Sequence, residues 1–151
     1  MISRIRIGYP QENAGAEARL LWDEAPETSQ AILSILPFRG TCHHAIYSGS
    51  ECVLLLDRVL RLPPENATIN VTRGDIGFAW LAAGSSYGVA ADFAEICWFY
   101  DLDAQPRMSE GPTPVNLFAR IVDPADAFYA VCRRIRREGV KLCSLEVVAD
   151  R

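Results

Sequence analysis

Short alternating segments dominate this sequence and constrain its fold more than any other feature. Apolar and polar residues alternate with a period of two, and turn-forming residues separate one such segment from the next. We predict strands at residues 2–7, 16–22, 41–47, 52–57, 67–72, 76–82, 95–100, 115–122 and 140–148. Eight or nine short strands at hairpin spacing favour a closed barrel or a sandwich over a layered α/β sheet.

Two segments depart from this pattern and have helical spacing. Residues 26–36 begin at Pro26, carry the apolar residues Ile32, Leu33 and Leu36, and are followed by Pro37, which ends the helix. The second segment has Asp123 as its expected N-cap and Gly139 just past its end. We therefore predict a mainly β fold: a closed, mainly antiparallel barrel of about eight strands, with two helices covering its ends.

The length and the charge limit the class of protein. A chain of 151 residues corresponds to one domain, which we place over residues 1–151. Fifteen Lys and Arg against nineteen Asp and Glu give a net charge of −4, which argues against a nucleic-acid or anionic-membrane partner. The N-terminus alternates instead of forming the apolar stretch of a signal peptide, and no apolar run reaches the roughly 20 residues of a membrane-spanning helix. We expect a cytoplasmic protein.

Five cysteines, at positions 42, 52, 97, 132 and 143, include no C-x-x-C pair. Each lies among apolar neighbours, so we expect free, buried thiols in a reducing compartment. His43 and His44 beside Cys42 are too few ligands for a structural zinc site. We expect no metal and no cofactor.

Gly84, Ser86 and Gly88 satisfy the G-x-S-x-G pattern of hydrolases. In that class the serine occupies a strained turn between a strand and a helix, and its histidine follows later in the chain. No histidine follows Ser86 in this sequence. The interpretation that we favour is a flexible loop between two strands.

Cys42 and His44 offer a second possible nucleophile. At positions i and i+2 of a strand their side chains share a face, which would permit thiolate chemistry. The sequence shows no third group to orient the histidine, so this remains a weaker hypothesis than a binding site.

Asn116 and Arg120 also share a face, at positions i and i+4 of one predicted strand. A buried guanidinium requires an acidic partner, and we predict Glu95 for that role. Together with neighbouring aromatic residues they define a predicted pocket for a small polar or anionic molecule or a peptide. Its seven predicted residues are His44, Tyr47, Trp80, Glu95, Tyr100, Asn116 and Arg120.

Residues 23–28 (D-E-A-P-E-T) and 38–44 (F-R-G-T-C-H-H) resemble two segments of cyclophilins. In that family the first segment starts the helix that plugs an eight-stranded barrel, and the second ends near a site histidine, which corresponds to His44. The position of the catalytic arginine is Ala45, so the resemblance does not imply prolyl isomerase activity.

A resemblance over nearly the whole chain is to a family of small, uncharacterised cyclophilin-like proteins from bacteria and archaea. The similar segments are D-E-A-P-E-T (23–28), H-A-I-Y-S-G (44–49), R-G-D-I (73–76), E-I-C-W-F-Y (95–100) and V-N-L-F-A-R-I (115–121). This resemblance implies a single cyclophilin-like barrel and no particular activity.

Three functions stay open from the sequence. The first is ligand binding in the pocket defined above. The second is an enzymatic activity that uses His44, either isomerase-like or the hydrolysis of an amide with Cys42 or Ser86. The third is assembly, because strand edges can pair into a homodimer or larger homo-oligomer.

Overall fold

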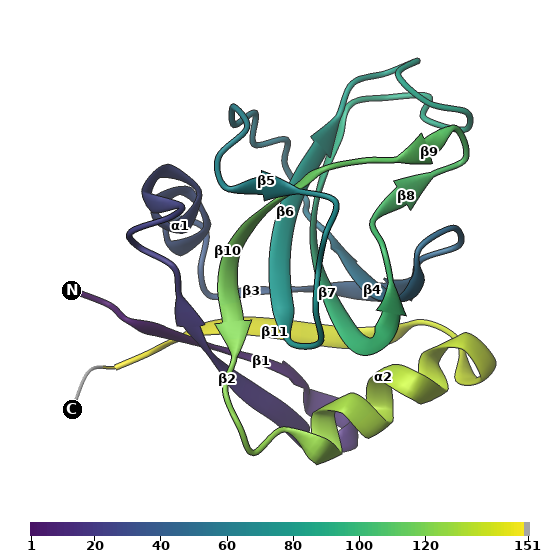
Figure 1. Cartoon of the computed structure of the whole chain (residues 1–151). Coiled ribbons are helices and arrows are strands. Elements are labelled where there is room, and N and C mark those ends of the chain that lie inside the picture. Colours follow the sequence, from purple (N-terminus) through teal and green to yellow (C-terminus); the bar gives the residue numbers. More distant parts are fainter. Residues whose placement is uncertain (150–151) are drawn as a thin grey trace.

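Eight antiparallel strands close into a barrel, which the computed structural model describes over residues 1–149 (Figure 1). Around the barrel the strand order is β2-β1-β11-β3-β4-β7-β6-β10, and pairing of β10 with β2 closes it. The strands are β1 (Arg4–Tyr9), β2 (Ala14–Leu20), β3 (Phe38–His44), β4 (Gly49–Leu55), β6 (Asp75–Leu81), β7 (Phe93–Ala104), β10 (Val115–Ile121) and β11 (Lys141–Val148). The predicted fold class is confirmed.

The shorter elements differ more from the prediction. They are the 3-10 helix η1 (Pro10–Glu12), β5 (Ala67–Thr68), β8 (Arg107–Met108) and β9 (Gly111–Pro112). The strand predicted at 67–72 is reduced to the two residues of β5, which pair with the start of β10. Residues 105–114, interpreted from the sequence as a surface loop, contain the β8–β9 hairpin.

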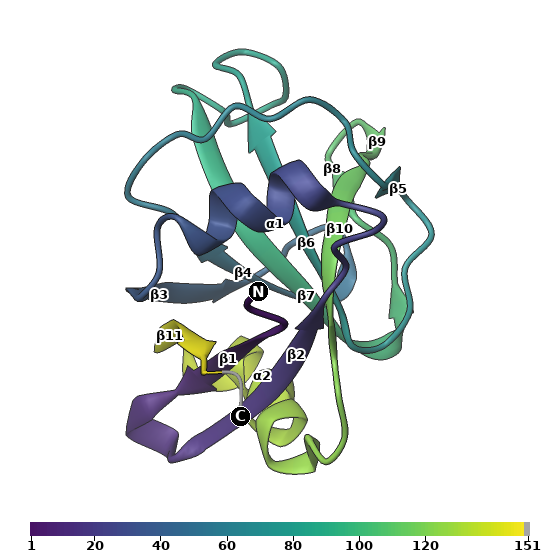
Figure 2. The same ribbon diagram turned by 90° about the vertical axis from the view of Figure 1, so that its left-hand side faces the viewer.

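The first helix, α1 (Pro26–Leu33), lies across the opening between β3 and β10 (Figure 2). The backbone N–H groups of Glu27 and Thr28 donate to the Glu65 carboxylate, which satisfies two of the free donors of its first turn. Ile32 is fully buried, and Leu33 and Leu36 pack against the same core. The expected plug is present, although the helix ends three residues earlier than predicted.

The second helix, α2 (Asp126–Glu138), buries Phe128, Val131 and Cys132 against the barrel interior. Gly139 follows it with a φ of 88°, a conformation that favours glycine. The predicted N-cap at Asp123 is wrong: the helix begins later, and Ala125 occupies the cap position without a side-chain hydrogen bond.

The barrel wall separates two apolar clusters. The first fills the interior and includes Ile96 and Trp98 of β7. The second lies on the opposite face of the wall and includes Cys97 and Phe99 of the same strand, with Met108 of β8 packed against it. The alternation of β7 between the two clusters follows from the period of two of a strand. The β8–β9 arm therefore helps to cover the outer face of the barrel.

Among the described residues, no helix has both the length and the apolar character needed to cross a membrane. All five cysteines are free thiols and all are buried.

Candidate functional site

One edge of β6 is free. This strand pairs with β7 as far as Leu81, but its pairing with β10 ends at Phe78. Within the part of the chain that the structure describes, residues 79–81 therefore have no strand partner on the β10 side. A groove follows this free edge, and we call it the β6 groove.

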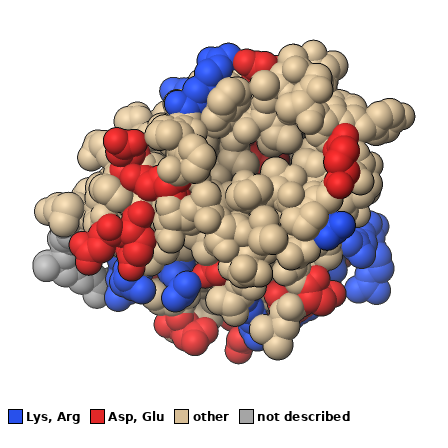
Figure 3. Space-filling model, turned by 45° about the horizontal axis from the view of Figure 1, so that its top comes forward, with Lys and Arg blue, Asp and Glu red and all other residues tan. Residues whose placement is uncertain are grey.

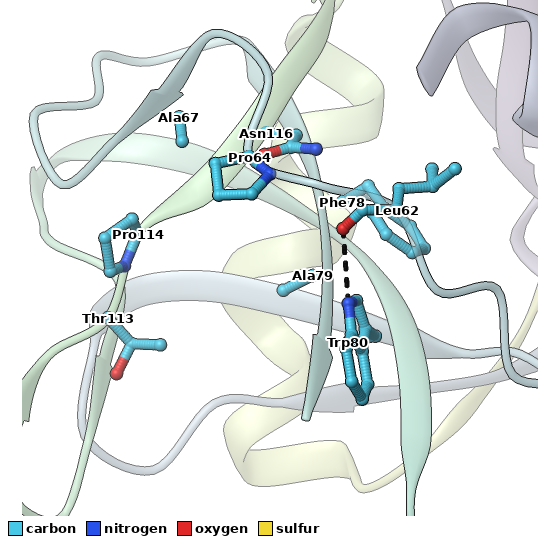
Figure 4. A pocket seen from close by; sticks show the side chains of 9 residues that line it. All are labelled: Leu62, Pro64, Ala67, Phe78, Ala79, Trp80, Thr113, Pro114 and Asn116. Atoms are coloured by element: carbon cyan, nitrogen blue, oxygen red, sulfur yellow. Dashed lines mark hydrogen bonds between the residues drawn. The ribbon is translucent and has the colours of Figure 1, made fainter. Parts of the chain in front are cut away.

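The β6 groove has two adjoining chambers, which share Trp80 and Thr113. The inner chamber, of about 330 Å³, is lined by Leu62, Pro64, Ala67, Phe78, Ala79, Trp80, Thr113, Pro114 and Asn116 (Figure 4). The outer chamber, of about 450 Å³, is lined by Trp80, Leu81, Ala82, Ser85, Ser86, Met108, Glu110, Gly111, Pro112 and Thr113. Most of these side chains are apolar.

Trp80 is held in place between the two chambers. Its indole N–H donates to the carbonyl of Leu62 at 3.2 Å (Figure 4), and the guanidinium of Arg61 lies 5.7 Å from its ring centre. Arg61 in turn forms an ion pair with Asp92 at 2.6 Å. The indole is therefore a fixed wall of the groove.

Asn116 lines the inner chamber, but its amide is used in structural bonds. Its Nδ2 donates to Thr28 Oγ1 at 3.2 Å and to the Pro63 carbonyl at 3.0 Å, while its Oδ1 accepts from the Glu65 N–H at 3.0 Å. These bonds connect β10 to α1 and to the segment that carries Leu62 and Pro64. Asn116 therefore shapes the chamber.

Ser86 lies in the outer chamber and donates to Glu110 Oε1 at 2.5 Å. Hydrogen bonds from Ser86, from the Tyr87 N–H and from Ser109 lower the pKa of Glu110 to about 2. The Ser86 loop joins strand β6 to strand β7, so the strand-to-helix turn of a hydrolase is absent here. The loop interpretation is confirmed, and hydrolysis through Ser86 has no histidine to support it because His44 lines a different cleft.

An acidic pair lies on the groove side of the barrel wall. Glu95 of β7 is placed between Leu55 of β4 and Ala79 of β6, and its side chain shares their face. Burial raises the pKa of Glu95 to about 8, and the charge of Glu51 contributes. Glu51 is 4% exposed, and burial raises its pKa to about 7 although hydrogen bonds from Ser48 and Cys97 lower it.

Glu95 itself lines neither chamber, but its cross-strand neighbour Ala79 lines the inner one and its diagonal neighbour Leu81, on the same face, lines the outer one. Figure 3 shows a hollow on this side of the molecule, with acidic atoms at its floor and mostly uncharged residues around it. Among residues 1–149, no group of three or more His, Cys, Asp or Glu side chains is arranged to hold a metal ion.

His44 lines a separate cleft of about 510 Å³ between the end of β3 and the end of α2, and the buried Tyr100 contacts its ring. The Tyr100 hydroxyl donates to His44 Nε2 at 2.6 Å, and His44 Nδ1–H donates to the Ala45 carbonyl at 2.7 Å. Burial lowers the pKa of His44, and the charge of Arg136 lowers it further. Both ring nitrogens of a neutral imidazole are thus occupied.

The predicted pairing of Arg120 with Glu95 is wrong. Arg120 Nε donates to Asp75 Oδ1 at 3.0 Å, and the arginine side chain is 48% exposed. The reason is the strand order: β6 lies between β10 and β7, so Arg120 of β10 stands directly opposite Asp75 of β6.

The predicted Cys42–His44 nucleophile is also not supported. Cys42 is fully buried, and its sulfur lies 3.6 Å from the Tyr9 hydroxyl in the barrel core. A substrate has no access to a thiol in this position.

The seven predicted pocket residues are therefore divided among three places. Trp80 and Asn116 line the β6 groove and Glu95 adjoins it, whereas His44 lines the second cleft and the buried Tyr100 hydrogen-bonds to it. Tyr47, 44% exposed, and Arg120 lie at the surface. The residues that the neighbouring loops contribute to the groove were not predicted from the sequence; they are chiefly Leu62, Pro64, Thr113 and Pro114. Their signal in the sequence was the pair of proline-containing segments at 63–64 and 112–114.

Comparisons with known proteins identify the fold and the family. No curated protein matches the sequence. The structure is similar to that of McbB, solved in complex with tryptophan, with a TM-score of 0.69 and 14% identity over 97% of this chain. This chain spans 45% of the McbB chain. It is also similar to the hypothetical protein AF2241 from Archaeoglobus fulgidus, with a TM-score of 0.63 and 23% identity over 97% of this chain and 95% of that one.

At these identities the two structures show a common fold and nothing more. The sequence also matches a protein family, described as a protein of unknown function (DUF3830), over residues 7–147. Because this match covers almost the whole barrel, the chain belongs to the DUF3830 family.

Proposed function

We propose that the β6 groove is a binding site for a small organic molecule with a flat apolar part. The observation that carries this proposal is the combination of two adjoining chambers, mainly apolar walls and a fixed indole at their junction. Both volumes lie in the range of roughly 300–1,000 Å³ typical of ligand pockets. A wall that is already ordered reduces the entropy lost on binding.

The free edge of β6 supports the same proposal. Residues 79–81 can offer backbone N–H and C=O groups to the polar atoms of a ligand, including those of a short peptide. Among the predicted pocket residues, we retain Trp80, Glu95 and Asn116 for this site. Arg120, predicted to orient an anion, lies outside the groove.

The test is a ligand screen by thermal shift, followed by NMR titration of the compounds that shift the melting temperature. The panel contains aromatic amines, alcohols and carboxylates, short peptides, and tryptophan, the molecule bound in the McbB structure. We expect Trp80→Ala to weaken binding at least tenfold. The matched control is Tyr87→Ala, since Tyr87 is an aromatic residue that is 82% exposed and lines neither chamber. Equal affinities in the two variants would move the site away from the groove.

Kinship with cyclophilins is part of our proposal for the fold, but we do not extend it to their activity. Ala45 stands at the position of the catalytic arginine, and both nitrogens of His44 are hydrogen-bonded. A coupled proline-isomer assay is therefore expected to show no acceleration that depends on His44.

We also propose that the protein works in the reducing environment of the cytoplasm, because its five buried thiols are unpaired. Self-association into a homodimer or larger homo-oligomer remains part of the proposal for its partners. Light scattering on the reduced protein measures this directly.

A further inference from the structure

The carboxyl of Glu95 is the one acidic group beside the β6 groove whose surroundings call for a partner. It is half-buried on β7, and among residues 1–149 it makes no hydrogen bond or ion pair. Leaving a buried carboxyl without a partner costs free energy. Glu110, by contrast, lines the outer chamber with its carboxylate already bonded to Ser86 and Tyr87.

Among residues 1–149, no cation is placed to pair with Glu95. Neither chamber is lined by a lysine or arginine of the described chain. Arg61, which lies over Trp80, already pairs with Asp92. The charged group that affects the pKa of Glu95 is Glu51, which is another acid. The potential at this end of the groove is therefore negative or neutral, and it would disfavour an anionic ligand.

We propose that the ligand of the β6 groove is an amine, whose ammonium group pairs with Glu95 while its apolar part lies in the outer chamber against Leu81, which shares the face of Glu95. This inference rests on the proposed function and names its ligand class. The ligand would supply the cation that the protein does not, and the mainly apolar walls would strengthen the pair by excluding water.

The titration of the site gives this proposal a signature. Burial keeps the pKa of Glu95 near 8, so a cation that binds beside it must displace a proton at neutral pH. Other titratable groups on this face are Glu51 of β4 and Cys97 of β7, with Glu110 at the outer chamber. β6 contributes only Asp75, at its opposite end. We therefore expect the affinity for an amine to increase as the pH is raised toward 8, by up to about tenfold per pH unit.

The experiment uses three probes with the same aromatic body: 2-phenylethylamine, 2-phenylethanol and 3-phenylpropionate. Their dissociation constants are measured by NMR titration or calorimetry on the full chain at pH 7 and pH 8. We expect the amine to bind about tenfold more tightly than the alcohol, and the carboxylate to bind most weakly. Glu95→Gln should remove the preference for the amine, and Glu24→Gln, which changes an exposed acid outside both chambers, should retain it.

Each outcome distinguishes the two proposals. If all three probes bind equally and Glu95→Gln changes nothing, the amine inference is overturned and the binding site stands. If none of the three binds the wild-type protein, both the site and the inference are contradicted. An equal loss in Glu95→Gln and Glu24→Gln would show a general effect of the protein's negative charge and overturn the specific pairing. Should Glu95→Gln fail to fold, the pH dependence of the amine's affinity in the wild-type protein decides the question.

Discussion

The polar groups on the interior face of β7 have hydrogen-bond partners, whereas a carboxyl on its outer face has none in the described part of the chain. On the interior face, the Trp98 indole N–H points to Cys132 Sγ at 3.4 Å, and the Tyr9 hydroxyl lies 3.3 Å from the same sulfur. On the outer face, which Glu95 shares with Cys97 and Phe99, the Glu95 carboxyl has no partner among residues 1–149. The two faces of one strand thus differ: the core side satisfies its polar groups, and the groove side of the described chain leaves a carboxyl without a partner.

This difference indicates that the barrel interior provides stability, whereas the groove side carries the candidate functional group. Inside the barrel, polar tips of large side chains find one another, as closed packing requires. At the free edge of β6, an acid is held close to solvent without a partner, an arrangement that folding alone does not favour.

Trp98→Ala should destabilise the protein by roughly 3–5 kcal/mol, because it removes a fully buried indole and leaves a cavity in the interior cluster. The free energy of unfolding is measured by urea titration. Leu102→Ala, at a position of β7 that is 84% exposed, serves as the control and should change stability by less than about 0.5 kcal/mol. A loss below about 1 kcal/mol for Trp98→Ala would mean that the interior is not the stabilising side.

Glu95→Gln should stabilise the protein at high pH. The folded-state pKa of Glu95 is about 8 against an ordinary value of 4.5, so between these values the folded state holds a proton that the unfolded state has lost. The contribution of this group to stability therefore falls as the pH rises through that window. At about 1.4 kcal/mol per pH unit the upper limit is roughly 5 kcal/mol, and partial exposure of the carboxyl reduces our expectation to roughly 2 kcal/mol.

The measurement is urea unfolding of the wild type and Glu95→Gln at pH 5, 7 and 9. The two proteins should have similar stability at pH 5, and the variant should be more stable at pH 9. Glu24→Gln, which changes an exposed acid, should show no such trend. A constant difference across the three pH values would show that Glu95 titrates normally.

Asn116→Ala should cost about 1–2 kcal/mol and weaken binding in the groove. The change leaves the Glu65 N–H and the Pro63 carbonyl without their amide partner and releases the segment that carries Pro64. Stability and probe affinity are measured on the same sample, with the exposed Asn70→Ala as control. If stability falls but probe affinity does not change, the chamber wall that Asn116 holds does not contact the ligand.

Arg120→Gln should have the smallest effect, about 0.5–1 kcal/mol, with no change in probe affinity. The arginine is 48% exposed, and its partner Asp75 also accepts a hydrogen bond from the Thr72 N–H. A clear loss of ligand affinity in this variant would extend the site to the outer surface of β10 and contradict the placement of Arg120 outside the groove.

Much of the barrel could be predicted from local pattern. Alternation placed the seven barrel strands after β1 close to their observed positions. For β1 itself the signal was Ile2, Ile5 and Ile7. Pro26 marked the start of α1 and Gly139 the end of α2, since these residues act through their own backbone conformation. The β8–β9 hairpin was missed because two-residue strands are too short to show a period.

The candidate site was predicted only in part, because shared strand faces were combined without knowledge of strand order. Trp80, Glu95 and Asn116 belong to one region, whereas Arg120 is separated from Glu95 by β6. His44 and Tyr100 do meet, but at the other cleft.

A barrel of short strands with two covering helices follows from local pattern, since alternation and helix ends are properties of neighbouring residues. Where the barrel wall is left unpaired depends on contacts between strands, which no local pattern contains. The pairing of β6 ends at different residues on its two sides, at Leu81 toward β7 and at Phe78 toward β10. The pairing of β6 with β10 joins strands that are not consecutive in the sequence, and its earlier end is what opens the groove.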